Sequence, residues 1–265
     1  MIKGRISVVI PVYNGADYIE KTINSIQRQT AGDVELIIVE DCSTDSSREI
    51  LKKIANGKSS LKIIFNEQNC GLQKTANRGA AAATGEYLMV CGQDDLFAPE
   101  HLELMIKLID EDTAFVHCNS IIIDENDNQK NNLKKTFLQH IKTYWFHRFI
   151  YLDNYISSCG LLMNKKKFDK IGGYIEEYRN FGEWMLWIRL GEIGKVKFNN
   201  KIKAYYRIHS KNMSKGIFKK SQKNDLLLEY YSKCRNRLKI KNKNILDKIF
   251  YFFSDILIFL KNKIK

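Results

Sequence analysis

Short apolar runs alternate with amphipathic stretches along the first 110 residues of the chain. Unbroken runs rich in Val, Ile and Leu are typical of strands buried on both faces of a parallel sheet. Between them, apolar residues recur at a spacing of three or four, which predicts helices. The predicted strands are residues 6–12, 34–39, 61–65 and 85–91, and the predicted helices are centred on Ile23, Leu51, Ala80 and Met105.

Four strand-then-helix units in about a hundred residues predict an α/β fold, because crossover connections between parallel strands are right-handed. The expected architecture is a doubly wound, mostly parallel central sheet with helices on both faces. The polar segments after the strands should then share one edge of the sheet, where such folds bind nucleotides. That edge would hold Tyr13, Asp41, Asn69, Asp94 and Asp95.

The fourth strand ends in two adjacent carboxylates, Asp94 and Asp95. Neighbouring acids at the end of a buried strand repel each other and lose hydration, so a cation or hydrogen-bond donors must satisfy them. Oxygen ligands of this kind suit Mg²⁺ or Mn²⁺ with a phosphorylated ligand. A simpler interpretation is that both acids cap the following helix, in which Pro99 suits the first position.

The second half of the chain is less regular. Residues 137–151 are rich in aromatic side chains and are interpreted as a packed helix, with a wall facing an acceptor or a membrane as the alternative. Glu183 begins a further helix, where the helix dipole favours a carboxylate. The remaining predicted elements are strands at residues 115–119, 121–124, 157–163, 195–198 and 203–208 and a short helix at 166–171.

The composition is that of a folded protein, with 44% hydrophobic and 28% charged residues among 265. Six cysteines are scattered without a C-x-x-C pair, so we expect buried thiols in a reducing compartment. No secretory signal precedes the first strand, which predicts a cytoplasmic protein.

The formal charge of +13 is concentrated in the tail. Residues 215–265 hold 14 Lys or Arg and four Asp or Glu, a net charge of +10 that leaves +3 for the rest. Residues 245–264 form an amphipathic pattern too charged to span a bilayer. Helical residues 240–265 are therefore predicted to lie on an anionic membrane, and packing on the core is the alternative. Charge confined to the tail argues against a nucleic-acid groove.

Ordered motifs occur at residues 7–14, 35–45, 69–71, 77–79, 85–87 and 206–209. Together they resemble those of the family 2 inverting glycosyltransferases, whose nucleotide-diphospho-sugar transferase fold is called GT-A. The resemblance covers residues 5 to about 215 and implies a GT-A domain over 1–215 with a C-terminal helical extension over 216–265. Within that domain, residues 1–112 would be the nucleotide-binding half and 113–215 the acceptor half.

The resemblance also implies roles for particular residues. Glu183 would be the catalytic base that activates the acceptor hydroxyl. A Mn²⁺ or Mg²⁺ ion would be held by Asp95, with Asp94 and His209 beside it. Donor contacts would come from Pro11, Tyr13, Asp41, Asn69, Asn77, Asp94 and Arg207.

Two positions depart from the family pattern. Gly92 replaces the first acid of the metal motif, so fewer protein ligands are available. Gly182 replaces the first acid of a Glu-Asp pair, which leaves Glu183 as the one carboxylate there.

The resemblance predicts a transferase that moves a sugar from a nucleoside-diphosphate donor, with a UDP-sugar favoured, to a polysaccharide or lipid-linked acceptor. Such an enzyme would work at the inner face of the cytoplasmic membrane. The alternatives are a non-catalytic nucleotide-sugar-binding protein and a sugar nucleotidylyltransferase. The latter needs a Gly-rich, Arg-containing phosphate loop after the first strand, and residues 11–14 form no such loop.

Overall fold

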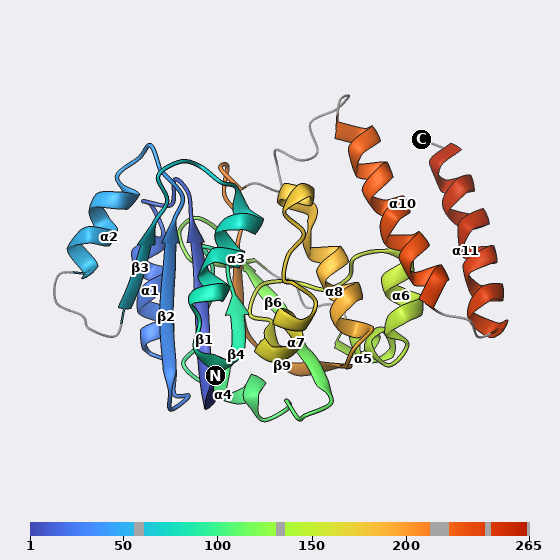
Figure 1. Cartoon of the computed structure of the whole chain (residues 1–265), viewed down its shortest axis with the longest axis horizontal. Coiled ribbons are helices and arrows are strands. Elements are labelled where there is room, and N and C mark those ends of the chain that lie inside the picture. The colour runs from blue at the N-terminus through green and yellow to red at the C-terminus, as the bar shows by residue number, and fades with distance from the viewer. Residues whose placement is uncertain (56–60, 131–135, 213–222, 242–244, 264–265) are drawn as a thin grey trace.

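The described strands form one mixed sheet flanked by helices (Figure 1). The computed structural model describes residues 1–55, 61–130, 136–212, 223–241 and 245–263. The strand order is β3-β2-β1-β4-β8-β6-β9-β5, with β7 beside β6. Strands β3, β2, β1 and β4 run parallel, and β8 is antiparallel to both of its neighbours. The predicted α/β fold with a mostly parallel central sheet is confirmed.

The bounds of the elements are as follows. The strands are β1 (Ile2–Val12), β2 (Val34–Glu40), β3 (Leu61–Phe65), β4 (Gly85–Val90), β5 (Leu96–Phe97), β6 (Thr113–Ile123), β7 (Gln129–Lys130), β8 (Leu162–Asn164) and β9 (Lys195–Arg207). The helices are α1 (Ile19–Gln27), α2 (Ser47–Ala55), α3 (Leu72–Ala82), α4 (His101–Ile106), α5 (Thr136–Tyr144), α6 (Phe146–Leu152), α7 (Lys165–Lys170), the 3₁₀ helix η1 (Glu176–Phe181), α8 (Glu183–Gly191), α10 (Lys223–Lys241) and α11 (Ile245–Lys263).

The two faces of β1 belong to different apolar clusters. Val9 lies in a cluster with side chains of α3 and α8, whereas Val8 and Ile10 lie in a cluster with α1. All three side chains are fully buried, and each such burial contributes about 1.5–3 kcal/mol. Helix α3 approaches β1 so closely that a Cβ at Gly79 would lie 2.3 Å from Val9 Cγ1. The position therefore requires glycine.

Several predicted elements in the second half need correction. Two strands were predicted within 115–124 and two within 195–208. Each range instead forms one continuous strand, β6 and β9. These two strands pair in parallel with register shifts. The strand predicted at 157–163 is wrong over most of its length, because only residues 162–164 pair with neighbours. Pro99 also precedes its helix, since α4 begins at His101.

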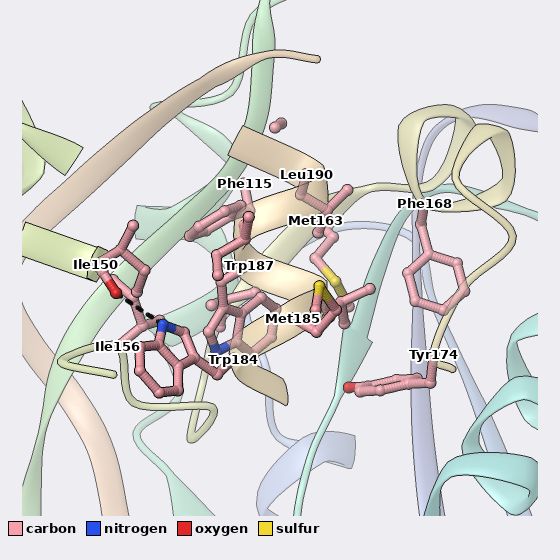
Figure 2. Close-up of a cluster of buried hydrophobic side chains, with 14 of the residues drawn as sticks. Phe115, Ile150, Ile156, Met163, Phe168, Tyr174, Trp184, Met185, Trp187 and Leu190 are labelled. Atoms are coloured by element: carbon pink, nitrogen blue, oxygen red, sulfur yellow. Dashed lines mark hydrogen bonds between the residues drawn. The ribbon is translucent and has the colours of Figure 1, made fainter. Parts of the chain in front are cut away.

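The aromatic segment folds as two helices, α5 and α6, that meet at Trp145. Phe146, Ile150 and Tyr151 are buried, which confirms packing for α6. The indole N–H of Trp184 donates to the Ile150 carbonyl at 2.8 Å, so α8 is tied to α6 within this cluster (Figure 2). At the junction, however, the side chains of Tyr144 and Trp145 are exposed.

Helices α10 and α11 stack against α6 and α8 at the end of the molecule far from α2 (Figure 1). Tyr230, Cys234 and Leu238 of α10 lie in the same apolar cluster as α8. Tyr251 packs the inner side of α11, and Asp247 pairs with Arg148 of α6 at 2.7 Å. No helix in the described ranges is long and apolar enough to cross a membrane.

A His101→Gln variant should be less sensitive to acid than wild type. His101 is buried, and its Nε2–H donates to the Gly160 carbonyl at 2.8 Å. Burial lowers the pKa of His101 from 6.5 to about 4. A lowered pKa on a base gives stability that is present above pH 6.5 and is lost as pH falls toward 4. Between pH 7 and 5 this loss is about 2 kcal/mol.

Glutamine keeps a donor for the Gly160 carbonyl but does not titrate. Chemical denaturation at several pH values would measure the free energy of unfolding of both proteins. An equally steep fall with pH in the His101→Gln variant would contradict the assignment.

Candidate active site

Gln93 joins the ends of β1 and β4. Its Oε1 accepts the N–H of Tyr13 at 2.8 Å, and its Nε2 donates to the Tyr13 carbonyl at 3.0 Å. Beside it, Asn14 has a positive φ of 52° and its Oδ1 accepts the N–H of Thr44, which links the β1 end to the loop after β2. The Tyr13 side chain is left 45% exposed at this edge.

The Asp41 carboxylate organises the loop after β3. Oδ1 accepts hydrogen bonds from Asn66 Nδ2 at 2.6 Å and from the N–H of Cys70 at 2.8 Å. Oδ2 accepts the N–H of Gly71 at 2.9 Å. The side chain is buried, so its clearest role is to hold residues 69–71 against the sheet edge. A contact from Asp41 to a nucleotide base stays a prediction.

Of the other predicted donor contacts on the N-terminal half, Asn69 is exposed beside that loop and Pro11 is a buried residue of β1 in register with Val39. Asn77 has a different environment. Its Nδ2 donates to the Tyr174 carbonyl and its Oδ1 accepts the Tyr174 N–H, both at 2.9 Å. This exchange ties α3 to the segment before η1, and a donor contact from Asn77 stays a prediction.

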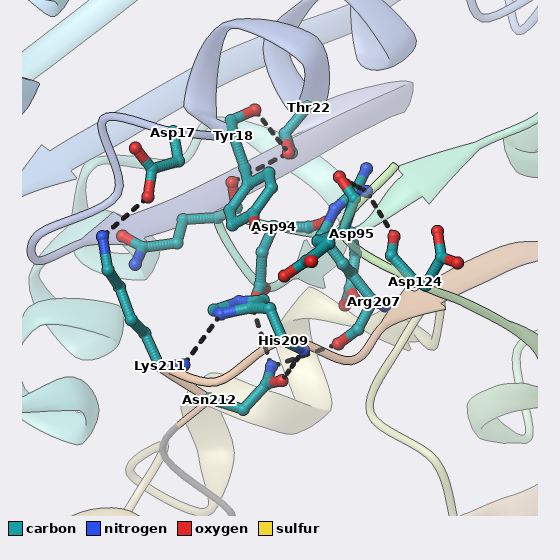
Figure 3. A network of polar contacts seen from close by, with 12 residues as sticks. Asp17, Tyr18, Thr22, Asp94, Asp95, Asp124, Arg207, His209, Lys211 and Asn212 are labelled. Carbon is teal, nitrogen blue, oxygen red and sulfur yellow. Dashed lines mark hydrogen bonds and ion pairs between the residues drawn. The ribbon is translucent and has the colours of Figure 1, made fainter. Parts of the chain in front are cut away.

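Asp94 meets His209 at the centre of the polar network (Figure 3). The distance between Asp94 Oδ2 and His209 Nε2 is 2.8 Å, and Asn212 Nδ2 donates to the same oxygen at 3.1 Å. His209 Nδ1 accepts the N–H of Lys211, so Nε2 carries the proton in the neutral ring and donates it to Asp94. The Tyr18 ring, 4.7 Å from the imidazole, packs against it.

Asp95 is enclosed behind Asp94. It is 4% exposed, and its Oδ1 accepts the N–H of Arg207 at 3.3 Å. Burial, together with the charge of Asp94, raises the pKa of the Asp95 carboxyl to about 7. The buried thiol of Cys159 is a further partner of this carboxyl. Asp94 is thus the more accessible member of the acidic pair.

The side chain of Arg207 is fully buried, and a contact from it to the donor stays a prediction. Nε donates to the Asp94 carbonyl and Nη1 to the Asp124 carbonyl, both at 2.9 Å. Nη2 pairs with Asp127 at 2.5 Å, and the guanidinium lies 4.7 Å from the centre of the Tyr18 ring. Arg207 therefore positions the backbone of Asp94 and the turn between β6 and β7.

The residues offer a limited set of metal ligands. Within the described part of the chain, no group of three or more His, Cys, Asp or Glu side chains could hold a metal ion. A Cβ at Gly92 would lie 2.7 Å from Asp94 Oδ1 and 3.1 Å from Asp95 Oδ2, so these carboxylates occupy the place of an acid at 92. Mg²⁺ is commonly bound by one or two carboxylates plus substrate phosphates. Asp94 with a diphosphate fits that pattern, and metal ligation by Asp95 and His209 stays a prediction.

Glu183 is the first residue of α8. It is linked to Asp95 through the segment 157–160, since Ser158 bonds to Glu183 and Cys159 to Asp95. A hydrogen bond from Ser158 favours its charged form, but burial has the larger effect and raises the pKa of the Glu183 carboxyl. Ser158 precedes Cys159, which contacts Asp95, so one short segment links the two acidic groups. A partly buried carboxylate with a raised pKa is suited to accept a proton.

Sequence reasoning missed Gln93, Asn212, Tyr18 and Asp127. Gln93 lies between the strand predicted at 85–91 and the two acids, and this place was the one available signal. The other three act through contacts with residues far away in the chain, which no local pattern reports.

Comparison with known proteins supports one family. Residues 7–172 match the family model described as glycosyl transferase family 2. An uncharacterized glycosyltransferase of Rickettsia conorii is 28% identical over 215 residues, which are 80% of this chain and 35% of the relative. The chain thus spans about a third of the length of that relative.

Two solved structures share the fold. The TarS 1–349 structure of S. aureus in complex with UDP-GlcNAc aligns with a TM-score of 0.67 and 19% identity over 89% of this chain and 66% of that chain. The mannosyltransferase PcManGT of Pyrobaculum calidifontis, in complex with GDP-Man and Mn²⁺, aligns with a TM-score of 0.63 and 13% identity over 97% and 81%.

Proposed function

The chain belongs to glycosyl transferase family 2, and we propose that it moves a sugar from a nucleoside-diphosphate donor to a hydroxyl group of a glycan or lipid-linked acceptor, with inversion. The observation that carries this proposal is the meeting of Tyr13, Asp41 and Asp94 at one edge of the sheet, with Glu183 one short segment away. Tyr13, Asp41 and Asp94 are suited to bind a nucleotide, and Glu183 is suited to activate a hydroxyl group.

The family resemblance favours a UDP-sugar as the donor. TarS is described in complex with UDP and with UDP-GlcNAc, and PcManGT with GDP-Man, so nucleotide sugars are bound by proteins of this fold. The exposed Tyr13 ring would border the base, and the loop held by Asp41 would line the same side. Both features are compatible with uridine and guanosine nucleotides. The binding experiment described below therefore identifies the base.

In the proposed reaction, the Glu183 carboxylate takes the proton of the acceptor hydroxyl. The acceptor oxygen forms a bond to the anomeric carbon while the bond from that carbon to the diphosphate oxygen breaks. The nucleoside diphosphate leaves with the bonding electrons. A Mn²⁺ or Mg²⁺ ion held by Asp94 would supply positive charge to the diphosphate. His209 and Asn212 hold the Asp94 carboxylate in place for that role.

The proposal is tested by calorimetry of UDP, UDP-GlcNAc, GDP and GDP-mannose against the purified protein, with and without Mn²⁺. Binding of one nucleotide and its sugar is expected, followed by transfer of an isotopically labelled sugar to a glycan or lipid acceptor. Binding without any transfer or donor hydrolysis would favour a non-catalytic nucleotide-sugar-binding protein. Absence of binding by every nucleotide would reject the proposal.

An Asp94→Asn variant is expected to lose the Mn²⁺-dependent part of donor affinity, about tenfold or more, because a neutral amide is a poor ligand for a hard cation. Titration of the donor with and without Mn²⁺ measures the effect. Asp33→Asn, which alters an exposed partner of Arg5, serves as the control and should bind as wild type does. An unchanged Mn²⁺ dependence in Asp94→Asn would show that Asp94 holds no metal.

We further propose that α11 attaches the protein to an anionic membrane surface, where a lipid-linked acceptor would lie. The outward side of α11 exposes Phe252, Phe253 and Ile256, and Lys248 is exposed on the same helix. Arg148 stacks on the rings of both Trp145 and Phe250, which brings the exposed aromatic junction of α5 and α6 next to α11. An apolar face with basic neighbours is suited to the interface of anionic lipids.

Replacing Phe252, Phe253 and Ile256 by Ser should weaken binding to phosphatidylcholine vesicles that contain phosphatidylglycerol by at least about tenfold, because the apolar area that enters the lipid is lost. Sedimentation with vesicles measures bound protein. Ile2→Ser removes an exposed apolar side chain at the start of β1 and should have no effect. Unchanged sedimentation of the triple variant would reject the membrane role of α11.

A further inference from the structure

Gln73 is a buried residue near the start of α3 whose carboxamide has no hydrogen-bond partner in the described part of the chain. The side chain is 1% exposed, and neither Nε2 nor Oε1 bonds to another group in the described part of the chain. Buried amides are normally hydrogen-bonded, since an unsatisfied donor or acceptor costs free energy. The amide can therefore still bond to an ordered water or to a polar group of a bound ligand.

The carboxamide lies directly over Gly182. A Cβ at Gly182 would lie 2.7 Å from Gln73 Nε2 and 2.9 Å from Cδ, so any larger residue would displace the amide. Gly182 is the N-cap of α8, and the next residue is Glu183. The family pattern has an acid at position 182, where this chain has glycine. The amide of Gln73 occupies the space that a side chain at 182 would need.

The loop held by Asp41 comes directly before Gln73 in the chain. Gly71, two residues earlier, donates its N–H to Asp41, and Cys70 does the same. Gln73 thus follows the loop that would border the nucleotide, and its carboxamide lies over Gly182, the residue before the carboxylate that would activate the acceptor. In a direct displacement, the transferred sugar has to lie between the diphosphate and the acceptor hydroxyl.

We propose that Gln73 binds the hydroxyl groups of the transferred sugar and contributes to donor specificity. The inference rests on the proposed function. Nε2 would donate to one sugar oxygen, and Oε1 would accept the proton of another hydroxyl. A site with a buried donor and acceptor discriminates against sugars that lack a matching hydroxyl, because the amide is then left unpaired.

The test compares the affinity of a nucleotide sugar with that of its nucleoside diphosphate. Calorimetry would use UDP and UDP-GlcNAc, or GDP and GDP-mannose if wild type binds that pair. Gln73→Met keeps the length of the side chain but removes its donor and acceptor. We expect the Kd of the nucleotide sugar to rise about tenfold, while the Kd of the nucleoside diphosphate stays unchanged.

Two further variants sharpen the result. Gly182→Ala should displace the carboxamide and produce the same selective loss. Gln139→Met on α5 also removes a glutamine with an unpartnered buried oxygen and should leave both affinities unchanged. Thermal unfolding of each variant verifies that it is folded.

An equal loss for the sugar nucleotide and the diphosphate in Gln73→Met would assign Gln73 a structural role and overturn the proposal. No loss in either would overturn it as well and would point to a bound water as the partner of the amide. If wild type binds no nucleotide, the proposed function itself fails. If wild type binds the donor but Gln73→Met does not selectively weaken the nucleotide sugar, only the role of Gln73 is rejected and the proposed function stands.

Discussion

A Glu183→Gln variant is expected to transfer sugar about 10²- to 10⁴-fold more slowly than wild type while it binds the donor normally. Glutamine preserves the shape of the side chain at the start of α8, but its neutral amide does not accept the proton of the acceptor hydroxyl. Steady-state rates at saturating donor and acceptor measure turnover, and calorimetry measures donor affinity. Glu177→Gln, an exposed residue of the adjacent η1, is the control and should behave as wild type.

The pH dependence of the reaction gives a second readout for Glu183. Burial raises the pKa of its carboxyl, so a larger share of the side chain is protonated near neutral pH than for an exposed glutamate. A base must be ionised to act, and activity should therefore fall as pH drops through this raised pKa. That acid limb should disappear from the profile of the Glu183→Gln variant. Unchanged turnover, or a loss of donor binding, would remove Glu183 from the role of catalytic base.

An Arg207→Met variant is expected to lose about 3 kcal/mol of unfolding free energy and to lose activity as well. Breaking a buried ion pair typically costs about 3–5 kcal/mol, because an unpaired charge remains. The low end applies here, since Asp127 is partly exposed and keeps its pair with Lys21 at 2.6 Å. Activity should fall because the Asp94 carbonyl loses the donor that fixes its strand end.

Chemical denaturation measures the stability of this variant, and Arg5→Met provides the matched control. Arg5 forms an exposed pair with Asp33, and such surface pairs contribute at most about 1 kcal/mol. If Arg207→Met were as stable as Arg5→Met but bound the donor poorly, Arg207 would be a direct donor ligand instead of a buried positioning residue.

Local periodicity was sufficient to predict the N-terminal half of the fold. The strand predicted at 61–65 is β3, and the helices centred on Ile23 and Leu51 are α1 and α2. These strands and helices pack on one another, so their apolar residues follow the side of each element that is buried. The same reasoning placed Tyr13, Asp41, Asp94 and Asp95 at one edge, because the carboxyl ends of parallel strands must meet there.

The second half was predicted less well for a physical reason. Strand β8 is short and antiparallel between β4 and β6, so its pairing depends on residues far away in the chain. The turn before it is set by Gly160, whose φ is +76° and whose α-carbon faces His101 so closely that a Cβ would lie 2.6 Å from Nε2. An apolar run such as 157–163 carries no sign of this constraint.

What the amino-acid sequence by itself determined is the α/β architecture, the family resemblance and the set of polar residues at the sheet edge. Only the tertiary structure decided how those residues share the roles. It buries Asp95 and Arg207, leaves Asp94 partly exposed and sets Gln73 over Gly182. Whether a charged side chain is enclosed or accessible depends on contacts between residues that are more than a hundred positions apart, such as Asp94 and His209. No local pattern contains that information, because it arises when the chain folds.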